Sequence, residues 1–373
     1  MQQKPRHIMA YAAGFCKGFR ITQVRNFARL CWAIFLRRTT VISELARAFK
    51  RPRRHSYRLK RMWRFLSNPR FNFQAVMDAV CLYNLAMALA AGACKAVLID
   101  ITFLSDGLAI LAAALAWQGR AIPVCMWAFQ RDNPQRSQNT LTHQMLAHLK
   151  GLLGSFVVVG DRGFGHSWTI ECCLRLGLHF VLRIRDEVLI TAGGRRGPAK
   201  SFLPPSDGRR FYPNALYHGQ KKLRVNFIAI RKGRATWLLV TSLSDFRRAV
   251  RLYEQRMQIE ETFRDFKSTL GLSRLRLRGV GRLQVMLVAL MVVYSFLFRS
   301  GVVLARSEFA KALAASGTEQ LSYPSLALIL IDTYPLLLRR LIRRLGRYDD
   351  SFDRELVADL ITAFACPVAP PLS

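Results

Sequence analysis

The spacing of apolar and polar positions changes twice along the chain. Up to about residue 92, apolar residues recur at helical spacing, as in YRLKRMWRFL and in the segment from Phe73 to Ala91. From Cys94 the pattern is that of strands, with AVLIDITFL, LAILAAALAW and AIPVCMWAF, and the turn QGR separates the last two. This order predicts an antiparallel meander of three strands that follows a helical region.

A helix, a strand, a second helix and another strand are expected after the meander, from QNTLTHQMLAHLKGLL, SFVVVGD, HSWTIECCLRLG and HFVLRIRD in turn. Between about 187 and 245, Gly- and Pro-rich turns alternate with short strands such as KKLRVNFIAIRK and ATWLLVTSL. We therefore expect an α/β fold: a helical domain at 1–92, a core of mixed sheet with flanking helices at 93–280 that contains a β-rich insertion at about 187–245, and a helical region at 281–373.

The charge of the chain indicates a polyanionic partner. There are 57 Lys and Arg residues against 23 Asp and Glu, a net charge of +34. Residues 1–70 contain eighteen Lys or Arg and the single acid Glu44, so half of the net charge lies there. Aromatic residues such as Tyr57 and Trp63 are interleaved with these cations, and the alternative is that they form the core of a small helical bundle. The helical domain is the candidate DNA-binding domain.

The longest hydrophobic stretch is VMLVALMVVYSFLF, residues 285–298. It is shorter than the roughly 20 residues that span a bilayer, so we expect a buried helix. The N-terminus has basic residues before IMAYAAGFC but no convincing cleavage site. Eight cysteines occur without a CxxC pair or zinc spacing, which is typical of reduced core thiols. We expect a cytoplasmic protein that has no membrane partner.

The segment YEQRMQIEETFRDFK carries the most specific polar pattern. At about 100° per residue, five polar side chains fall within an arc of roughly 80° on one helix. They are Tyr253, Arg256, Glu260, Arg264 and Lys267. An adjacent apolar face would pack on the core and hold this stripe rigid; it contains Leu252, Ile259, Phe263, Phe266 and Leu270. The alternative interpretation is an ordinary solvated face of a surface helix.

Two upstream carboxylates indicate that the polar stripe is part of a catalytic site. Asp100 lies in the middle of the apolar strand AVLIDITFL, where a buried charge requires a partner. Asp161 closes the strand SFVVVGD before a Gly-rich turn, although it could equally be a turn residue or a helix cap. Together with Glu260, these carboxylates could hold Mg²⁺, which prefers oxygen ligands. Two such ions catalyse phosphodiester displacement, so the pattern indicates a nuclease or strand-transfer site.

The chain resembles bacterial insertion-sequence transposases of the DDE class, in the family numbered four. The signature of that family is Tyr, two residues, Arg, three residues, Glu, six residues, Lys, and it is matched without a gap by Tyr253, Arg256, Glu260 and Lys267. The resemblance also covers DITF, GDRGFG, FVLRIR and TWLLVTSL, and thus residues 40 to 275 or so. It implies a ribonuclease H-like catalytic core.

The resemblance further implies roles for single residues. Asp100, Asp161 and Glu260 would be the catalytic metal ligands for Mg²⁺, with Mn²⁺ as a substitute. Tyr253, Arg256 and Lys267 would contact phosphates of the transposon end. Trp237 would stack on a flipped base during hairpin formation, and Arg162 and Arg183 would lie near that nucleotide. Where related proteins have a Trp wedge after the signature Arg, this chain has Met257, which leaves the hairpin step open.

The function expected on this basis is metal-dependent cutting of the ends of an insertion sequence and joining of these ends to target DNA. The partners would be double-stranded DNA, as terminal inverted repeats and as target, and a second copy of the chain in a homodimeric DNA complex. Two alternatives remain. One is a metal-dependent nuclease of the same fold without strand transfer, and the other is a catalytically silent DNA-binding protein derived from a transposase.

Overall fold

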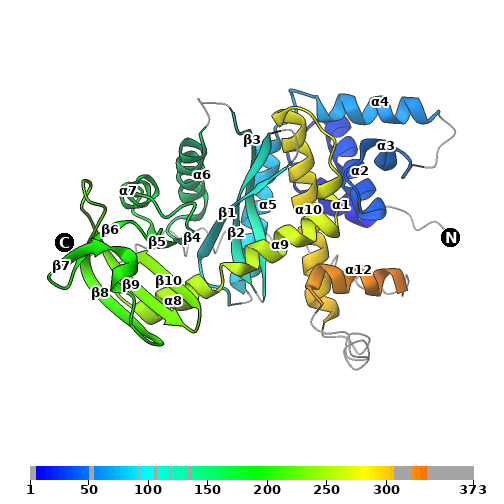
Figure 1. The fold of residues 1–373 in the computed structure, drawn as a ribbon. Helices are drawn as coiled ribbons and strands as arrows, with labels where there is room; N and C mark the ends of the chain where they lie inside the picture. Colours follow the sequence, from blue (N-terminus) through cyan, green and yellow to red (C-terminus); the bar gives the residue numbers. More distant parts are fainter. Residues whose placement is uncertain are drawn as a thin grey trace.

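The structure is a computed structural model, and it describes residues 6–333 apart from 50–53, 91, 105–106, 118, 133–136 and 306–320. Figure 1 shows a group of helices at one end, a sheet with flanking helices in the middle and a lobe of strands at the other end. The C-terminal part of the expected helical region lies outside the described residues.

The chain begins with helices, as the apolar periodicity predicts. They are α1 (Arg6–Gly14), α2 (Ile21–Arg37), α3 (Ile42–Ala46), α4 (His55–Leu66) and α5 (Phe73–Ala90). α4 has a short apolar face, Met62, Phe65 and Leu66, which is buried, while its cationic residues occupy the rest of the surface. α5 packs directly on the sheet, so the proposed boundary at residue 92 falls between two elements that share one core.

The expected meander and the α/β units that follow it are confirmed element by element. The strands are β1 (Ala96–Phe103), β2 (Leu108–Trp117), β3 (Arg120–Gln130), β4 (Val157–Gly160) and β5 (His179–Arg183), with helices α6 (Gln138–Leu153) and α7 (Ser167–Arg175) between the last three. The order is β3-β2-β1-β4-β5. β1 pairs with β2 antiparallel and with β4 parallel, and β4 pairs with β5 parallel. The sheet is therefore mixed.

The β-rich insertion extends this same sheet. Its elements are β6 (Leu189–Ala192), β7 (Arg195–Pro198), the short 3₁₀ helix η2 (Ala199–Phe202), β8 (Gly208–Tyr217), β9 (Leu223–Lys232) and β10 (Ala235–Thr241). β10 pairs antiparallel with β5, so the ten strands follow the order β3-β2-β1-β4-β5-β10-β9-β8-β6-β7. This continuity places the insertion beside β5, one strand away from β4.

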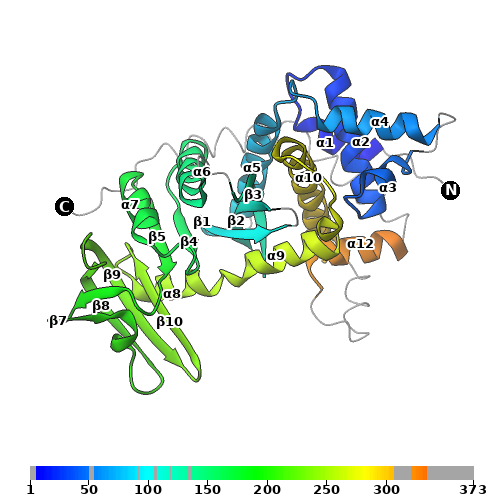
Figure 2. The same ribbon diagram turned by 45° about the horizontal axis from the view of Figure 1, so that its top comes forward.

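Helices cover the two faces of the central strands. In both views α5, α6 and α7 lie on one side, and α8 (Phe246–Glu254) and α9 (Met257–Ser268) lie on the other. Figure 2 shows α9 running along the sheet from the strand-rich lobe toward the helical group. A short 3₁₀ helix η3 (Leu272–Arg274), α10 (Val280–Leu304) and α12 (Tyr323–Thr333) follow. Every residue from 285 to 298 is buried, which confirms the expected core helix.

The length argument made for that stretch from its 14 apolar residues was nevertheless wrong. Among the described residues, α5 and the 280–302 part of α10 are both long and apolar enough to cross a membrane. Within the apolar window of α10, 89% of the residues are buried inside the protein, as expected for a core helix. Length and composition alone therefore do not distinguish a buried core helix from a membrane span.

Helix side chains satisfy the free backbone groups of the outer strand β3. Thr262 of α9 hydrogen-bonds the N–H and the C=O of Ala121, at 2.9 and 2.7 Å. Gln284 of α10 likewise accepts from the N–H of Ala128 and donates to the C=O of Met126, at 2.8 and 2.6 Å. An exposed edge strand invites pairing with another chain. These bonds close the edge and fix α9 to the sheet.

Candidate active site

Asp100 sits in the middle of β1, as expected, and its carboxylate is partly buried. The pKa of Asp100 is raised to about 6, mainly by burial and in smaller part by the charges of Asp161 and Glu260. The backbone N–H of Ile101, which donates to Asp100 Oδ1 at 2.8 Å, and the charge of Arg256 act in the opposite direction. The three predicted carboxylates are thus close enough to repel one another electrostatically.

Asp161 is the first residue after β4, and a tight turn holds it there. Its Oδ1 accepts a hydrogen bond from the N–H of Gly163 at 2.9 Å, so the turn-residue interpretation describes its local bonding. The turn is pressed against β5, because a Cβ on Gly165 would lie 1.8 Å from the carbonyl oxygen of Arg183. Only glycine fits at that position. The turn therefore serves to place Asp161 at the end of the strand, next to Asp100.

Glu260 lies in the first turn of α9, and the helix that carries it differs from the expectation. The sequence predicts one continuous helix from Tyr253 to Lys267, but α8 ends at Glu254 and α9 begins at Met257. The N–H of Arg256 bonds the carbonyl of Tyr253, and that of Ile259 bonds the carbonyl of Arg256, which are tight i to i+3 bonds. The helical periodicity persists through this tightened turn, so the apolar face is buried as expected.

Arg256 occupies the break between the helices and faces the carboxylates. Its Nη2 lies 2.5 Å from Glu260 Oε1, and its side chain is 12% exposed against 41% for Glu260. Burial lowers the pKa of Arg256, but the hydrogen bond that Arg256 donates to Glu260 and nearby charges, including Asp100, outweigh this effect and raise that pKa. The positive charge of Arg256 therefore offsets the negative charge of the neighbouring carboxylates.

Tyr253, Arg183 and Trp237 form a second group next to this one. Burial raises the pKa of Tyr253, and the neighbouring Arg183 and Arg256, together with a hydrogen bond from Arg183, lower it. The Trp237 and Tyr253 rings meet edge to face, with centroids 5.2 Å apart. Arg183 also donates to the carbonyl of Thr236 at 2.9 Å, which ties β5 to the strand that carries Trp237. Trp237 is half-buried and faces the signature Tyr.

Three predicted residues lie apart from these groups. Arg162 is exposed on the turn after β4, and Lys267 lies in the last turn of α9; neither side chain forms an ion pair within the described residues. Met257, at the predicted wedge position, is 52% exposed beside Arg256, whose Nη2 is 3.1 Å from the Met257 sulfur. Arg264, on the same predicted stripe, pairs instead with Glu261 at 2.8 Å.

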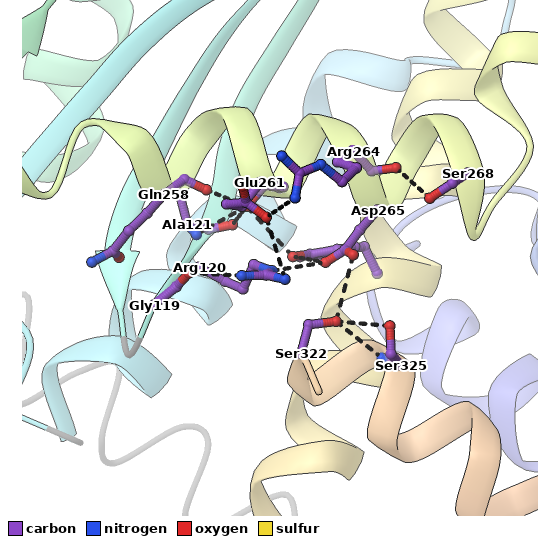
Figure 3. Close-up of polar contacts among 12 residues, drawn as sticks. Gly119, Arg120, Ala121, Gln258, Glu261, Arg264, Asp265, Ser268, Ser322 and Ser325 are labelled. Atoms are coloured by element: carbon purple, nitrogen blue, oxygen red, sulfur yellow. Dashed lines mark hydrogen bonds and ion pairs between the residues drawn. The ribbon is translucent and has the colours of Figure 1, made fainter. Parts of the chain in front are cut away.

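The position of Glu260 depends on a buried polar network that sequence reasoning missed (Figure 3). Asp265 of α9 accepts from Arg120 Nε and from the hydroxyl of Tyr294, both at 3.3 Å, and from Ser322 at 3.4 Å. Burial raises the pKa of Asp265, and Arg120 opposes this effect. The sequence pattern did not single out Asp265, because at about 100° per residue it lies well away from both the predicted polar stripe and the predicted apolar face of its helix. The network joins α9 to the β2–β3 hairpin, α10 and α12.

The donor atoms fit a hard divalent cation. Asp100, Asp161 and Glu260 offer only carboxylate oxygens, which Mg²⁺ and Mn²⁺ prefer, and their mutual repulsion would be relieved by a cation. In the described part of the chain, no three such side chains are close enough to enclose a metal ion. Glu260 is held by Arg256 instead. A metal-bound site would require Glu260 to exchange this partner.

Comparisons with known proteins concern the reaction class and not the single residues of the site. Residues 125–296 match the family described as transposase DDE domain. The match supports a DDE-type transposase. It includes Asp161 and Glu260 but begins after Asp100. No curated protein matches the chain.

Among solved structures, the chain is similar to the cryo-EM structure of a piggyBac transposase synaptic complex with hairpin DNA. The identity is 13%, the TM-score is 0.42, and the alignment covers 98% of this chain and 84% of that one. A similarity of this strength establishes neither a shared fold nor a shared activity.

Proposed function

We propose that the chain is a transposase that cuts the ends of its own insertion sequence and joins them to target DNA by metal-dependent phosphoryl transfer. The observation that carries this proposal is that Asp100, on a strand, lies within electrostatic range of Asp161, at a strand end, and of Glu260, on a helix. The match to a transposase DDE domain supports the same reaction class. Membership in the family numbered four, a cytoplasmic location and the absence of a membrane partner are parts of the proposal.

The strand order supports a ribonuclease H-like core for residues 93–280. Three antiparallel strands, followed by two parallel strands on the other side of β1, give the order β3-β2-β1-β4-β5. Asp100 lies on the central strand and Asp161 at the end of its parallel neighbour, and strand ends of this kind are where α/β proteins bind ligands. The strands of the insertion then bring Trp237 to the rim of the site.

Each residue of the site has a separate task in this proposal. Asp100, Asp161 and Glu260 would hold Mg²⁺ or Mn²⁺, which polarises the scissile phosphate and activates the attacking water or hydroxyl. Arg256, once released from Glu260, is free to bind a phosphate oxygen, and Tyr253 donates its hydroxyl nearby. Positioning of the phosphate by such groups contributes much of the acceleration in phosphoryl transfer.

The DNA partner and the pairing of two copies follow from the same chemistry. The net charge of +34 suits a protein that neutralises phosphates, and it also disfavours self-association without DNA. Joining two ends to one target requires two sites, so we propose a homodimer that DNA bridges. A hairpin intermediate is part of the proposal, with Trp237 as the stacking residue and with Arg162 and Arg183 near the flipped nucleotide.

The test uses purified protein, a duplex that contains the DNA flanking its gene, and Mg²⁺ or Mn²⁺. Asp100→Asn, Asp161→Asn and Glu260→Gln are each expected to abolish nicking and to leave binding of the duplex nearly intact. The matched control is Glu254→Gln, because Glu254 is exposed on α8 and forms no ion pair in the described structure. This variant should cut at the rate of the unchanged protein.

The products distinguish the proposal from its alternatives. Joined target molecules identify a transposase, whereas cut ends that never join a target identify a nuclease. Binding without any metal-dependent nick identifies a silent DNA-binding protein. Substantial nicking by one of the three carboxamide variants removes that residue from the site.

A further inference from the structure

The segment that joins α9 to α10 has a pattern that the proposed active site does not use. Its sequence is SRLRLRGVGR, from Ser273 to Arg282. Residues 275–278 belong to no helix or strand, Leu275 has an extended backbone conformation, and burial alternates from one residue to the next. Leu275 and Leu277 are buried, and the intervening arginines are exposed. We call residues 274–278 the basic strap.

The strap is fastened at its first residues to the N-terminal helices. Arg274 pairs with Glu44 of α3 at 2.7 Å, so the single acid of residues 1–70 is already neutralised. Thr40 donates to the carbonyl of Gly271 at 2.7 Å. Gly271 has φ of 71°, and a Cβ there would lie 2.8 Å from the carbonyl oxygen of Arg38. The segments around Gly271 and Arg38 therefore lie in close contact.

Arg276 and Arg278 have no such partner. Both are exposed, and neither forms an ion pair or a side-chain hydrogen bond within the described residues. No acidic residue occurs between 266 and 307 in the sequence. Two fixed, closely spaced cations repel each other, and an anion that lies across them relieves this repulsion.

A groove between α4 and the start of α10, the helix that follows the strap in the chain, has further basic residues. Its volume is about 430 Å³, and it is lined by Trp63, Arg64, Ser67 and Arg282. Arg282 donates to the Ser67 hydroxyl at 2.8 Å, and its guanidinium lies 5.4 Å from the centre of the Trp63 ring. α4 itself contains no acidic residue. The groove thus presents two arginines, one of which is held in place.

We propose that the basic strap and this groove bind the phosphate backbone of the DNA between the part recognised by the N-terminal helices and the part cut at Glu260. This inference rests on the proposed function. The strap is the covalent link between the helix that carries Glu260 and the helical group, so DNA that contacts both must pass it. Eight residues of helix separate Glu260 from Ser268, about 12 Å at 1.5 Å per residue. At about 3.4 Å per base pair, the strap contacts phosphates roughly four or more base pairs from the cut.

The test compares two variants that lose the same charge. Arg276→Ala/Arg278→Ala removes the free cations of the strap. Arg209→Ala/Arg210→Ala, the control, removes two exposed cations from β8 in the strand-rich lobe. Both doubles should keep the melting temperature of the unchanged protein, because none of these side chains is bonded within the described structure.

Binding to a duplex that contains the element end is measured from low to high salt. Each lost phosphate contact lowers the slope of log affinity against log salt by about 0.9, so the strap variant should lose about 2. Hydroxyl-radical footprinting should show new cleavage a few base pairs from the cut site in that variant only. An unchanged slope and footprint, or the same loss in the control, would overturn the proposal.

The same experiment separates this inference from the proposed function. If the protein neither cuts nor joins DNA but its salt slope depends on the strap, the function is wrong and the strap site stands. If it cuts and joins normally with the strap removed, the strap proposal alone fails. Strap-dependent flotation with phosphatidylglycerol vesicles, combined with unchanged DNA binding, would assign the surface to lipid and overturn the DNA site.

Discussion

Replacing Thr262 by Val tests whether the outer strand of the sheet holds the catalytic helix in place. The Thr262 hydroxyl accepts from the N–H of Ala121 at 2.9 Å and lies 2.7 Å from its carbonyl, which accepts in turn. Thr262 is 2% exposed and stands two residues from Glu260 in the same helix. Valine keeps the branched shape and the volume but removes both hydrogen bonds.

The expected loss of stability follows from the two backbone groups of Ala121 that this change leaves without a hydrogen-bond partner. A buried donor or acceptor without a partner costs about 1–3 kcal/mol, so two of them cost about 2–6 kcal/mol. The added apolar methyl group, at about 1 kcal/mol, offsets part of this. We therefore expect Thr262→Val to lower the free energy of unfolding by about 1–5 kcal/mol, and to slow DNA nicking because α9 is no longer fixed to β3.

Urea denaturation measures the free energy of unfolding, and native-state hydrogen exchange shows which backbone amides lose protection. The amide of Ala121 should exchange faster in Thr262→Val, while amides in the strand-rich lobe should be unaffected. Thr269→Val, at the end of the same helix, is the matched control and should change little, since no hydrogen bond of its hydroxyl is present in the described structure. A loss below about 0.5 kcal/mol with unchanged protection of Ala121 would refute this account of the edge.

Three further changes test other parts of the site. Gly165→Ala places a Cβ 1.8 Å from a carbonyl oxygen of β5 and should reduce nicking at least tenfold, because it displaces the turn after β4. The control Gly151→Ala, in open space on α6, should not reduce nicking. Equal nicking rates for the two variants would contradict this account of the packing at Gly165. Trp237→Ala should slow hairpin formation about ten- to a hundredfold while first-strand nicking persists; a denaturing gel that shows unaltered hairpin yield would exclude base stacking. Burial raises the pKa of Asp265 above its ordinary value of 3.8. The folded state therefore binds the Asp265 proton more tightly than the unfolded state, and the free energy of unfolding should fall as pH rises from 3.8 through the raised pKa. Asp265→Asn should remove this pH dependence in urea titrations. An unchanged dependence of stability on pH in Asp265→Asn would contradict the role of this carboxyl.

The sequence alone predicted most elements, and it proposed the residues of the site. Helical and alternating periods depend on which faces of a segment are buried, and this information is local, so α6 and the strands from β1 to β5 lie where expected. Asp100 was identified as a charge inside an apolar strand, and Asp161 as the end of another. Their proximity to Glu260 came from the resemblance, and the structure brings the three together electrostatically.

The tertiary structure decided what depends on distant partners. The break between α8 and α9 was not visible because one tightened turn leaves the 3.6-residue period nearly unchanged. The pairing of β10 with β5, which brings Trp237 to Tyr253, is a choice among strands with similar patterns.

The bonds of Thr262 and Gln284 to the edge of β3 also arise only when the helices pack on the sheet. The pairing of Arg256 with Glu260 likewise could not be predicted from the sequence. Spacing places the two side chains on one stripe, but whether that glutamate faces an arginine or a metal ion depends on every charge gathered around it.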